Sequence, residues 1–235
     1  MIFASLANAG VVYWDGGTST SWATGSNWIG GVAPANSTVT DIAGFNFSSS
    51  PANAPNAGAR SINGLIIGDG LTAVPAFTLA GTNLRIGDAG IVKNASSLAT
   101  LISTGITLAA DQSWINNSTT SLTVAGNIVS NGFDLTFDGS GNMTARGVVS
   151  GNGSITKAGT GSLTLNGSNT YTGGTAITGG TLIVDAVANK ETLGAGQIAF
   201  NGSGATLQLA DSVGKSNRNY ILSQTGTINT NGFDL

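Results

Sequence analysis

The chain has 235 residues, with 8 basic and 11 acidic side chains, a net charge of −3, and neither cysteine nor histidine. This composition excludes disulfide frameworks, zinc sites of the usual Cys/His kind, and nucleophilic or acid–base chemistry that depends on Cys or His. The basic residues are scattered singly from Arg60 to Arg218, so no basic stripe is available for a phosphate backbone and we expect no nucleic acid partner. Only 8% of the residues are charged and 40% are apolar, which predicts a packed interior.

The first nine residues, MIFASLANA, end in the small-x-small spacing Ala7-Asn8-Ala9 that signal peptidase recognises. We interpret residues 1–9 as the remnant of an export signal; the alternatives are an ordinary first strand or an extraneous segment. No apolar run in the sequence approaches the ~18 residues needed to cross a bilayer, so we do not expect this chain to be embedded in a membrane.

Residues 10–59 differ in texture from the rest of the chain and are predicted to form an N-terminal cap of irregular and β structure. Three of the four tryptophans, Trp14, Trp22 and Trp28, lie here among Ser, Asn, Gly and Ala. They are candidates for a sugar-stacking platform, but aromatic residues near the end of a solenoid more often seal its core, and we favour that interpretation.

From about residue 60 to residue 235 the sequence consists of short apolar segments at regular intervals, such as LIIG, SLTVAG and SLTLNG. Each segment alternates apolar residues with Thr, Ser or Asn and ends in Gly, Asn or Asp, the pattern of short half-buried strands. LIIGDG at 65–70 returns as LRIGDAG at 84–90, and NGFDL at 131–135 returns at 231–235. Only residues 185–196 have a pattern compatible with a turn of helix.

These repeats predict an all-β chain wound into a parallel β-helix, also called a β-solenoid. Strands too short to stand in a hairpin can pair with the same strand of the windings above and below, while Gly and Asn turn the corners. With roughly twenty residues per winding, about nine windings are expected over 61–235. The alternation places one set of side chains inside (Phe133, Leu135, Phe137, Leu163, Leu165) and the other outside (Asp134, Thr136, Asp138, Ser162, Thr164).

The segment GSITKAGTGSLTLNGSNTYTGGTAITGGTLIVDA at 153–186 resembles the autotransporter-associated β-strand repeats of bacterial passenger domains, with looser similarity over 105–152 and 193–209. The opening YWDGGTSTSWATGSNW is similar to the segment that often precedes such repeats. The resemblance implies a right-handed parallel β-helix that is exported and displayed on, or released from, a Gram-negative-type cell as a stalk or adhesin. The residues that carry it have structural roles: Lys157, Gly159, Gly161, Leu163, Leu165, Asn169, Tyr171, Gly173, Gly174, Gly179, Gly180 and Leu182.

A β-helix is also a scaffold for polysaccharide lyases, so the carboxylates were tested as candidate sites. Asp134 and Asp138 face the same way, but four residues of strand separate them by about 13 Å, more than the ~5–9.5 Å of acid/base carboxylate pairs. Asp69 and Asp88 occupy matching places in the two GD motifs, where a stacked pair could bind calcium; we favour the alternative that both are corner residues. The sequence therefore predicts no catalytic, cofactor-binding or metal-binding residue.

Two further patterns were weighed for binding roles. Thr-x-Thr occurs only sporadically, at 18–20, 38–40, 170–172 and 225–227, so a regular ice-binding face is not predicted. Trp114 is predicted to be a packed side chain.

The function predicted from the sequence is that of a non-enzymatic, extracellular structural or adhesive β-helix: a stalk, an adhesin or a filament subunit. The alternative is a carbohydrate-binding or carbohydrate-active β-helix of the polysaccharide lyase kind. The second NGFDL ends the sequence where the first continues into its strand, so the last winding stops part-way. Such an end predicts either a continuing protein or end-to-end docking of copies by β-augmentation; surface glycans or other cells are the remaining expected partners.

Overall fold

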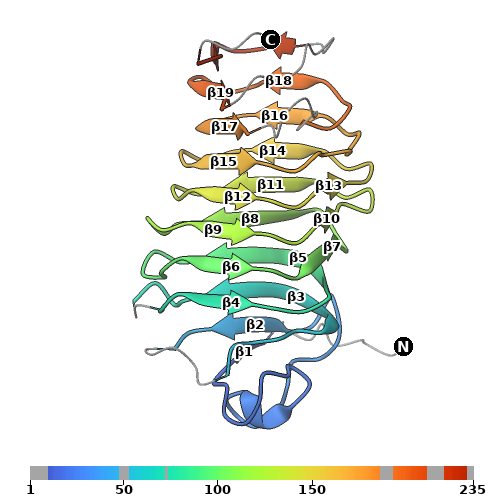
Figure 1. The fold of residues 1–235 in the computed structure, drawn as a ribbon, viewed down its shortest axis with the longest axis vertical. Coiled ribbons are helices and arrows are strands. Elements are labelled where there is room, and N and C mark those ends of the chain that lie inside the picture. The colour runs from blue at the N-terminus through green and yellow to red at the C-terminus, as the bar shows by residue number, and fades with distance from the viewer. Residues whose placement is uncertain (1–9, 48–52, 72–73, 186–192, 211–219, 232–235) are drawn as a thin grey trace, which may run out of the picture.

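The computed structural model describes residues 10–47, 53–71, 74–185, 193–210 and 220–231, and within them the chain forms a parallel β-solenoid of about 7 turns. Figure 1 shows the strands stacked one above another along the long axis of the molecule, from the blue N-terminal region to the red C-terminal windings. The predicted fold class, an all-β parallel β-helix, is confirmed. The expected count of nine windings was too high, because many windings use more than twenty residues.

The strands belong to two sheets in which neighbouring strands run parallel. The eight-stranded sheet contains β4 (Phe77–Leu79), β6 (Thr100–Ile102), β9 (Leu122–Val124), β12 (Met143–Ala145), β15 (Ser162–Leu165), β17 (Thr181–Val184), β19 (Ala205–Leu209) and β21 (Gly226–Asn229). The main path of the thirteen-stranded sheet contains β1 (Val11–Tyr13), β2 (Ile42–Phe45), β3 (Ala59–Ile67), β5 (Asn83–Lys93), β8 (Gln112–Asn116), β11 (Leu135–Asp138), β14 (Ile155–Lys157), β16 (Thr175–Ile177), β18 (Ile198–Phe200) and β20 (Tyr220–Leu222). Three strands of the same sheet lie off that path: β7 (Gly105–Leu108), β10 (Ile128–Val129) and β13 (Val149–Ser150). The described residues include one short 3₁₀ helix, η1 (Gly25–Asn27).

The middle windings have three sides because β5 bends part-way along its length. The first half of β5, up to Ile86, pairs with β7, whereas its second half, from Ile91, pairs with β8. Gly90 lies between the halves with φ of 61°, a left-handed conformation that glycine adopts without strain. The thirteen-stranded sheet therefore covers two sides of these windings, and the eight-stranded sheet covers the third.

The predicted alternation of buried and exposed residues is confirmed where strands stack in register. Leu163 is fully buried and pairs with Met143 in the winding before it and with Leu182 in the winding after it. In β11 the side chains of Leu135 and Phe137 point inward, with exposures of 1% each. Stacking of like residues along the axis thus builds one continuous apolar core.

The register between β3 and β5, around residues 65–90, differs from the one that the sequence repeat indicates. The similarity of LIIGDG to LRIGDAG places Leu65 opposite Leu84, but Leu65 pairs with Ile91, and Leu84 pairs with Arg60. An irregularity between Ile62 and Gly64 shifts the register further. The shift of nineteen residues is therefore not the length of this winding, because extra residues are accommodated at its corners.

The N-terminal tryptophans are buried, not exposed. Trp14, Trp22 and Trp28 are each 1% exposed, and Trp28 lies edge-on to both of the others with ring centroids 5.1 and 5.3 Å apart. Trp22 also packs on Phe45 of β2, which joins the cluster to the solenoid core. The alternative of a sugar-stacking platform is therefore wrong, because no face of these rings is available to a sugar. Trp114 is likewise fully buried, as predicted.

The boundary between cap and repeats at residue 60 stays a prediction. Two strands of the 10–59 segment, β1 and β2, already continue the thirteen-stranded sheet through the pairing of β2 with β3. Between them the chain is irregular apart from η1. The proposed signal remnant, residues 1–9, lies outside the described residues, as does most of the segment compatible with a helical turn, 186–192.

Glycine and asparagine occupy positions that other residues fill poorly. Gly126, Gly147 and Gly167 form a column in which a Cβ on each glycine would overlap the backbone carbonyl of the winding before it, at Thr104, Gly126 and Gly147 respectively. Asn131 and Asn231, which begin the two NGFDL copies, have φ of 54° and 48°, as expected of asparagine at a left-handed corner.

In the described part of the chain, no helix has both the length and the apolar character needed to span a membrane.

Candidate functional site

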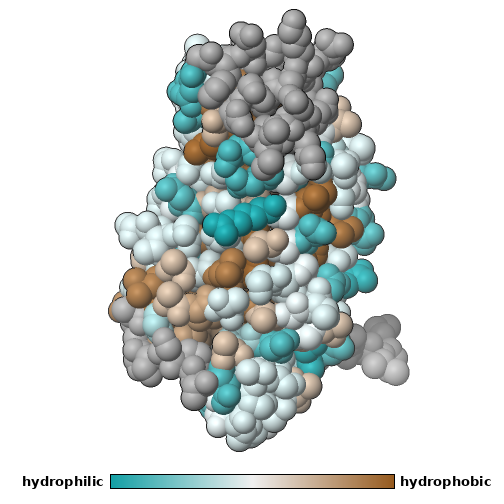
Figure 2. All heavy atoms as spheres, viewed as in Figure 1, coloured by the Kyte–Doolittle hydropathy of each residue, from teal (hydrophilic) through white to brown (hydrophobic). Residues whose placement is uncertain are grey.

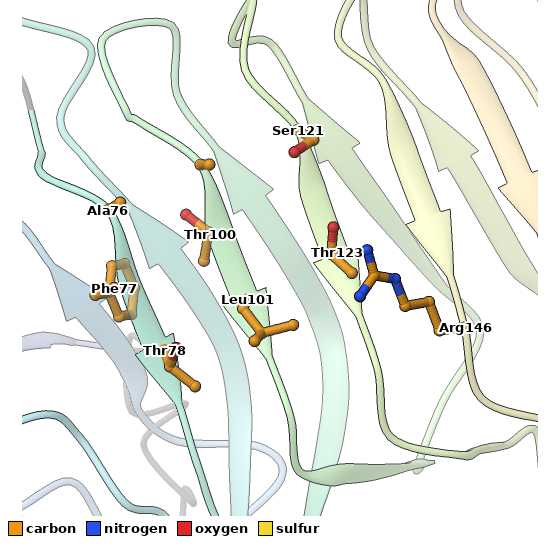
Figure 3. A pocket seen from close by; sticks show the side chains of 9 residues that line it. Ala76, Phe77, Thr78, Thr100, Leu101, Ser121, Thr123 and Arg146 are labelled. Carbon is orange, nitrogen blue, oxygen red and sulfur yellow. The ribbon is translucent and has the colours of Figure 1, made fainter.

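A shallow hollow of about 350 Å³ lies on the outer face of the eight-stranded sheet, across β4, β6 and β9 (Figure 3). The residues that line it come from four successive windings: Ala76, Phe77, Thr78, Ala99, Thr100, Leu101, Ser121, Thr123 and Arg146. The hollow is open to solvent, so it suits a ligand that lies across the sheet.

The strand register decides which side chains reach the hollow. Thr78, Leu101 and Thr123 stand in one outward-facing column because they are paired in successive strands. Directly before each of these strands is a second exposed position, and it holds a small side chain in all three windings: Ala76, Ala99 and Ser121. One side of the hollow is therefore shallow.

Arg146 supplies the charge of the hollow. It follows β12, its side chain is exposed, and Figure 3 shows its guanidinium reaching back beside Thr123. No carboxylate lines the hollow, and no ion pair to this guanidinium is found within the described residues. In the sequence the basic residues are scattered, and nothing there singles out Arg146, because its neighbours come from other windings.

A second hollow, of about 310 Å³, lies at the corner before β8 and β11 and is acidic. Asp88, Asp111 and Asp134 line it at intervals of 23 residues. The Asp111 carboxylate accepts a hydrogen bond from the Asp134 backbone N–H at 2.9 Å, and the Asp134 carboxylate accepts from the backbone N–H and hydroxyl of Ser154 at 2.7 and 2.9 Å. Two of these carboxylates therefore bind the backbone of the next winding. The equal spacing was a signal in the sequence that could have revealed this row.

The carboxylate pairs considered from the sequence are not brought together. Asp69 accepts hydrogen bonds from the Asn46 side chain and the Leu71 backbone, whereas Asp88 lies within β5, which pairs with β3 of the winding before it. The stacked pair of Asp69 and Asp88 is therefore wrong, for the same reason of register given above. Across the described ranges, no group of three or more His, Cys, Asp or Glu side chains is arranged to hold a metal ion.

Asp134 and Asp138 also have separate partners. The Asp138 carboxylate accepts from the backbone N–H of Gly139, while that of Asp134 is engaged with Ser154. Both carboxylates hold backbone groups in place, which is a structural role.

Two lysines are buried inside the solenoid. The Lys93 ammonium donates to the carbonyls of Ser97 and Thr120 at 3.2 and 3.0 Å and to the Thr120 hydroxyl at 2.8 Å. The side chain is fully buried, and this desolvation lowers the pKa of Lys93 from 10.5 to about 8. Lys93 could not be identified from the sequence, because lysine is rarely buried without partners and one of its carbonyl partners, Thr120, lies in the next winding.

Lys157 holds a glycine corner together. Its ammonium donates to the carbonyls of Ala158, Gly159 and Gly179, the last two at 3.1 and 3.3 Å. Burial lowers the pKa of Lys157 to about 8, and the nearby Asp138 carboxylate partly opposes this shift. These contacts support the structural role that the resemblance implies for Lys157 and Gly159.

The buried ammonium of Lys157 makes stability depend on pH. Below pH 8 both the folded and the unfolded states carry this proton, and the fold bears the full desolvation of the cation. Between pH 8 and about 10.4, the pKa of an unfolded lysine, the folded state releases the proton first, so the free energy of unfolding rises with pH, by at most about 1.4 kcal/mol per pH unit. Compared with Lys157→Met by urea denaturation from pH 7 to 9.5, the wild-type chain should gain stability as the pH rises. Lys93 is present in both proteins, so its contribution to the pH dependence cancels in the comparison. A difference in the free energy of unfolding that does not change with pH would contradict the lowered pKa of Lys157.

The comparisons with known proteins agree with this architecture. Residues 155–184 match the family described as the passenger-associated-transport-repeat. The match starts at the first residue of β14 and ends at the last residue of β17, so it covers two successive copies of one strand from each sheet. Comparisons with the curated proteins and with the solved structures found no match. The predicted resemblance is confirmed: residues 155–184 are similar to the passenger-associated transport repeat of autotransporter passengers, and they lie within a parallel β-solenoid.

Proposed function

We propose that this chain is a non-enzymatic, extracellular β-helix that acts as a stalk or adhesive domain on the surface of a Gram-negative-type bacterial cell. The observation that carries the proposal is the passenger repeat lying in register within a continuous parallel stack. A stack of this kind has a packed core along its whole length, so it extends as a semi-rigid rod. Its outward strand positions are mostly hydroxyl and small side chains, which suits contact with polar surfaces.

Association of copies end to end is the proposed mode of self-assembly. β20 and β21 are the outermost strands of the two sheets among the described residues, and an outermost strand can offer unpaired backbone N–H and C=O groups to a further strand. A strand from a second copy could pair with these edges by β-augmentation and lengthen the rod into a filament. Negative-stain microscopy of the purified chain distinguishes single rods from filaments.

Carbohydrate binding is the second candidate function, and the hollow beside Arg146 is the observation that favours it. The tryptophans give it no support, because they are buried. A lyase activity is less well supported than binding, since Asp134 and Asp138 are each engaged by backbone groups.

Protease treatment of intact cells that produce the full-length protein tests the surface location. We expect added protease to remove the chain, detected with an antibody against the solenoid, while a periplasmic marker stays intact. Cells that lack the protein should adhere less to a polar surface than cells that display it. Digestion of the chain only after lysis would contradict the proposal.

A further inference from the structure

The side chain of Arg146 is unusual among the cations of the described chain. Lys93 and Lys157 are buried against carbonyls, and Arg60 donates to the carbonyl of Pro34 at 2.8 Å. Arg85 of β5 and Arg146 are both exposed, and of these two it is Arg146 that lines the hollow on the eight-stranded sheet, among described residues that include no carboxylate, although the chain as a whole is acidic. A guanidinium placed in this way is free to pair with an anion brought by a ligand.

We propose that the hollow on the outer face of β4, β6 and β9 binds an acidic polysaccharide, with Arg146 pairing with a sugar carboxylate. This inference rests on the proposed adhesive function and names the class of ligand for it. Arginine suits the task because its planar fork of N–H donors matches both oxygens of a carboxylate.

The other lining residues suit a sugar chain better than a compact anion. The hydroxyls of Thr78, Ser121 and Thr123 can exchange hydrogen bonds with sugar hydroxyls, and Leu101 offers an apolar surface to the C–H face of a ring. On the face shown in Figure 2, pale residues of intermediate hydropathy are interspersed with hydrophobic and strongly hydrophilic ones. The hollow runs across successive windings and is open, so an extended polymer can lie along it.

A second copy of the chain is the competing occupant, since its acidic corner could receive Arg146. We favour the polysaccharide because two of the three carboxylates in that corner, those of Asp111 and Asp134, already accept hydrogen bonds from backbone N–H groups of the following winding. An ion pair formed there would share these two carboxylates with the hydrogen bonds that they already accept. A uronate carboxylate arrives free of such contacts.

The expected affinity of one site is low. An exposed ion pair contributes about 0–1 kcal/mol, so single contacts alone hold a short oligosaccharide weakly. A polymer with many carboxylates that meets many displayed copies gains from multivalency, and salt should weaken the binding because the pair is solvent-exposed.

Polygalacturonate and its fully methyl-esterified form are suitable probes, because esterification removes the carboxylate charge and leaves the sugar backbone unchanged. The full-length chain is immobilised at high density, and polymer binding is measured at about 50 and 300 mM salt. We expect binding of polygalacturonate at low salt, at least about tenfold weaker binding at high salt, and little binding of the ester. Arg146→Gln should reduce polygalacturonate binding about tenfold, whereas the matched control Arg85→Gln, which changes an exposed arginine of β5, should change it less than about twofold.

Three results would overturn the proposal: equal binding of the ester, undiminished binding by Arg146→Gln, or equal losses in both variants. Sedimentation of the wild-type chain and both variants tests whether a second copy occupies the hollow. A dimer that is lost in Arg146→Gln but kept in Arg85→Gln would assign the hollow to a second copy and overturn the proposal. Circular dichroism confirms that each variant is folded. The protease test on intact cells does not depend on this binding experiment. The polysaccharide proposal can therefore fail while the proposed surface location stands.

Discussion

Leu163→Asp should abolish the native fold of the central windings, whereas Thr164→Asp, one residue later in the same strand, should leave it intact. Leu163 is fully buried between Met143 and Leu182 of the adjoining windings. Aspartate there loses the apolar contacts and places a charge without a partner in the core, which together destabilise by more than about 4 kcal/mol. Thr164 points outward from β15, so its replacement should change the free energy of unfolding by less than about 1 kcal/mol.

Urea denaturation followed by circular dichroism measures both variants, and limited proteolysis locates the damage. Because each winding contacts mainly its neighbours, we expect new cleavage around β12, β15 and β17 before the N-terminal windings are cut. Equal losses of stability in the two variants would contradict the assignment of inside and outside.

Gly147→Ala is expected to have the second largest effect, even though it adds only a methyl group. Its Cβ would overlap the backbone carbonyl of Gly126, and a backbone atom of the neighbouring winding has little room to move. Separating two windings to admit the methyl group disturbs the ladders on both sides, so we expect a loss of about 1–3 kcal/mol.

Gly105→Ala is the matched control. This glycine also lies in the solenoid wall, but the nearest atom to its added Cβ is the Thr82 carbonyl oxygen at 3.4 Å, an ordinary contact. Thermal unfolding of the two variants should show a clear drop in Tm for Gly147→Ala and little change, or a slight rise, for Gly105→Ala. A similar drop in both would show that glycine flexibility, and not close approach of windings, governs these positions.

The sequence predicted the local structure well, because strand alternation is a property of neighbouring residues. The burial of Leu135, Phe137 and Leu163 followed from the two-residue period alone. The register could not be predicted in this way. The pairing of Leu65 with Ile91 depends on how many residues each corner contains, and the sequence repeat does not give that number.

The candidate site was harder to predict for the same reason. Arg146 and Thr78 are distant in sequence and meet in one hollow only because four windings stack in a particular register. Lys93 was missed because its partners, Ser97 and Thr120, become neighbours only once the corners are formed. Of the site residues, the row Asp88, Asp111 and Asp134 had a signal in the sequence, its constant interval.

Because the windings differ in their number of residues, the length of the solenoid along its axis is not proportional to the length of the chain. The step from Leu65 to Ile91 uses 26 residues and the step from Leu163 to Leu182 uses 19, yet each adds one strand to its ladder. The strand spacing, about 4.8 Å, is the same for both. Insertions or deletions confined to corners can therefore reshape the sides of such a protein during evolution while its length along the axis stays constant, and only gain or loss of a whole winding changes that length.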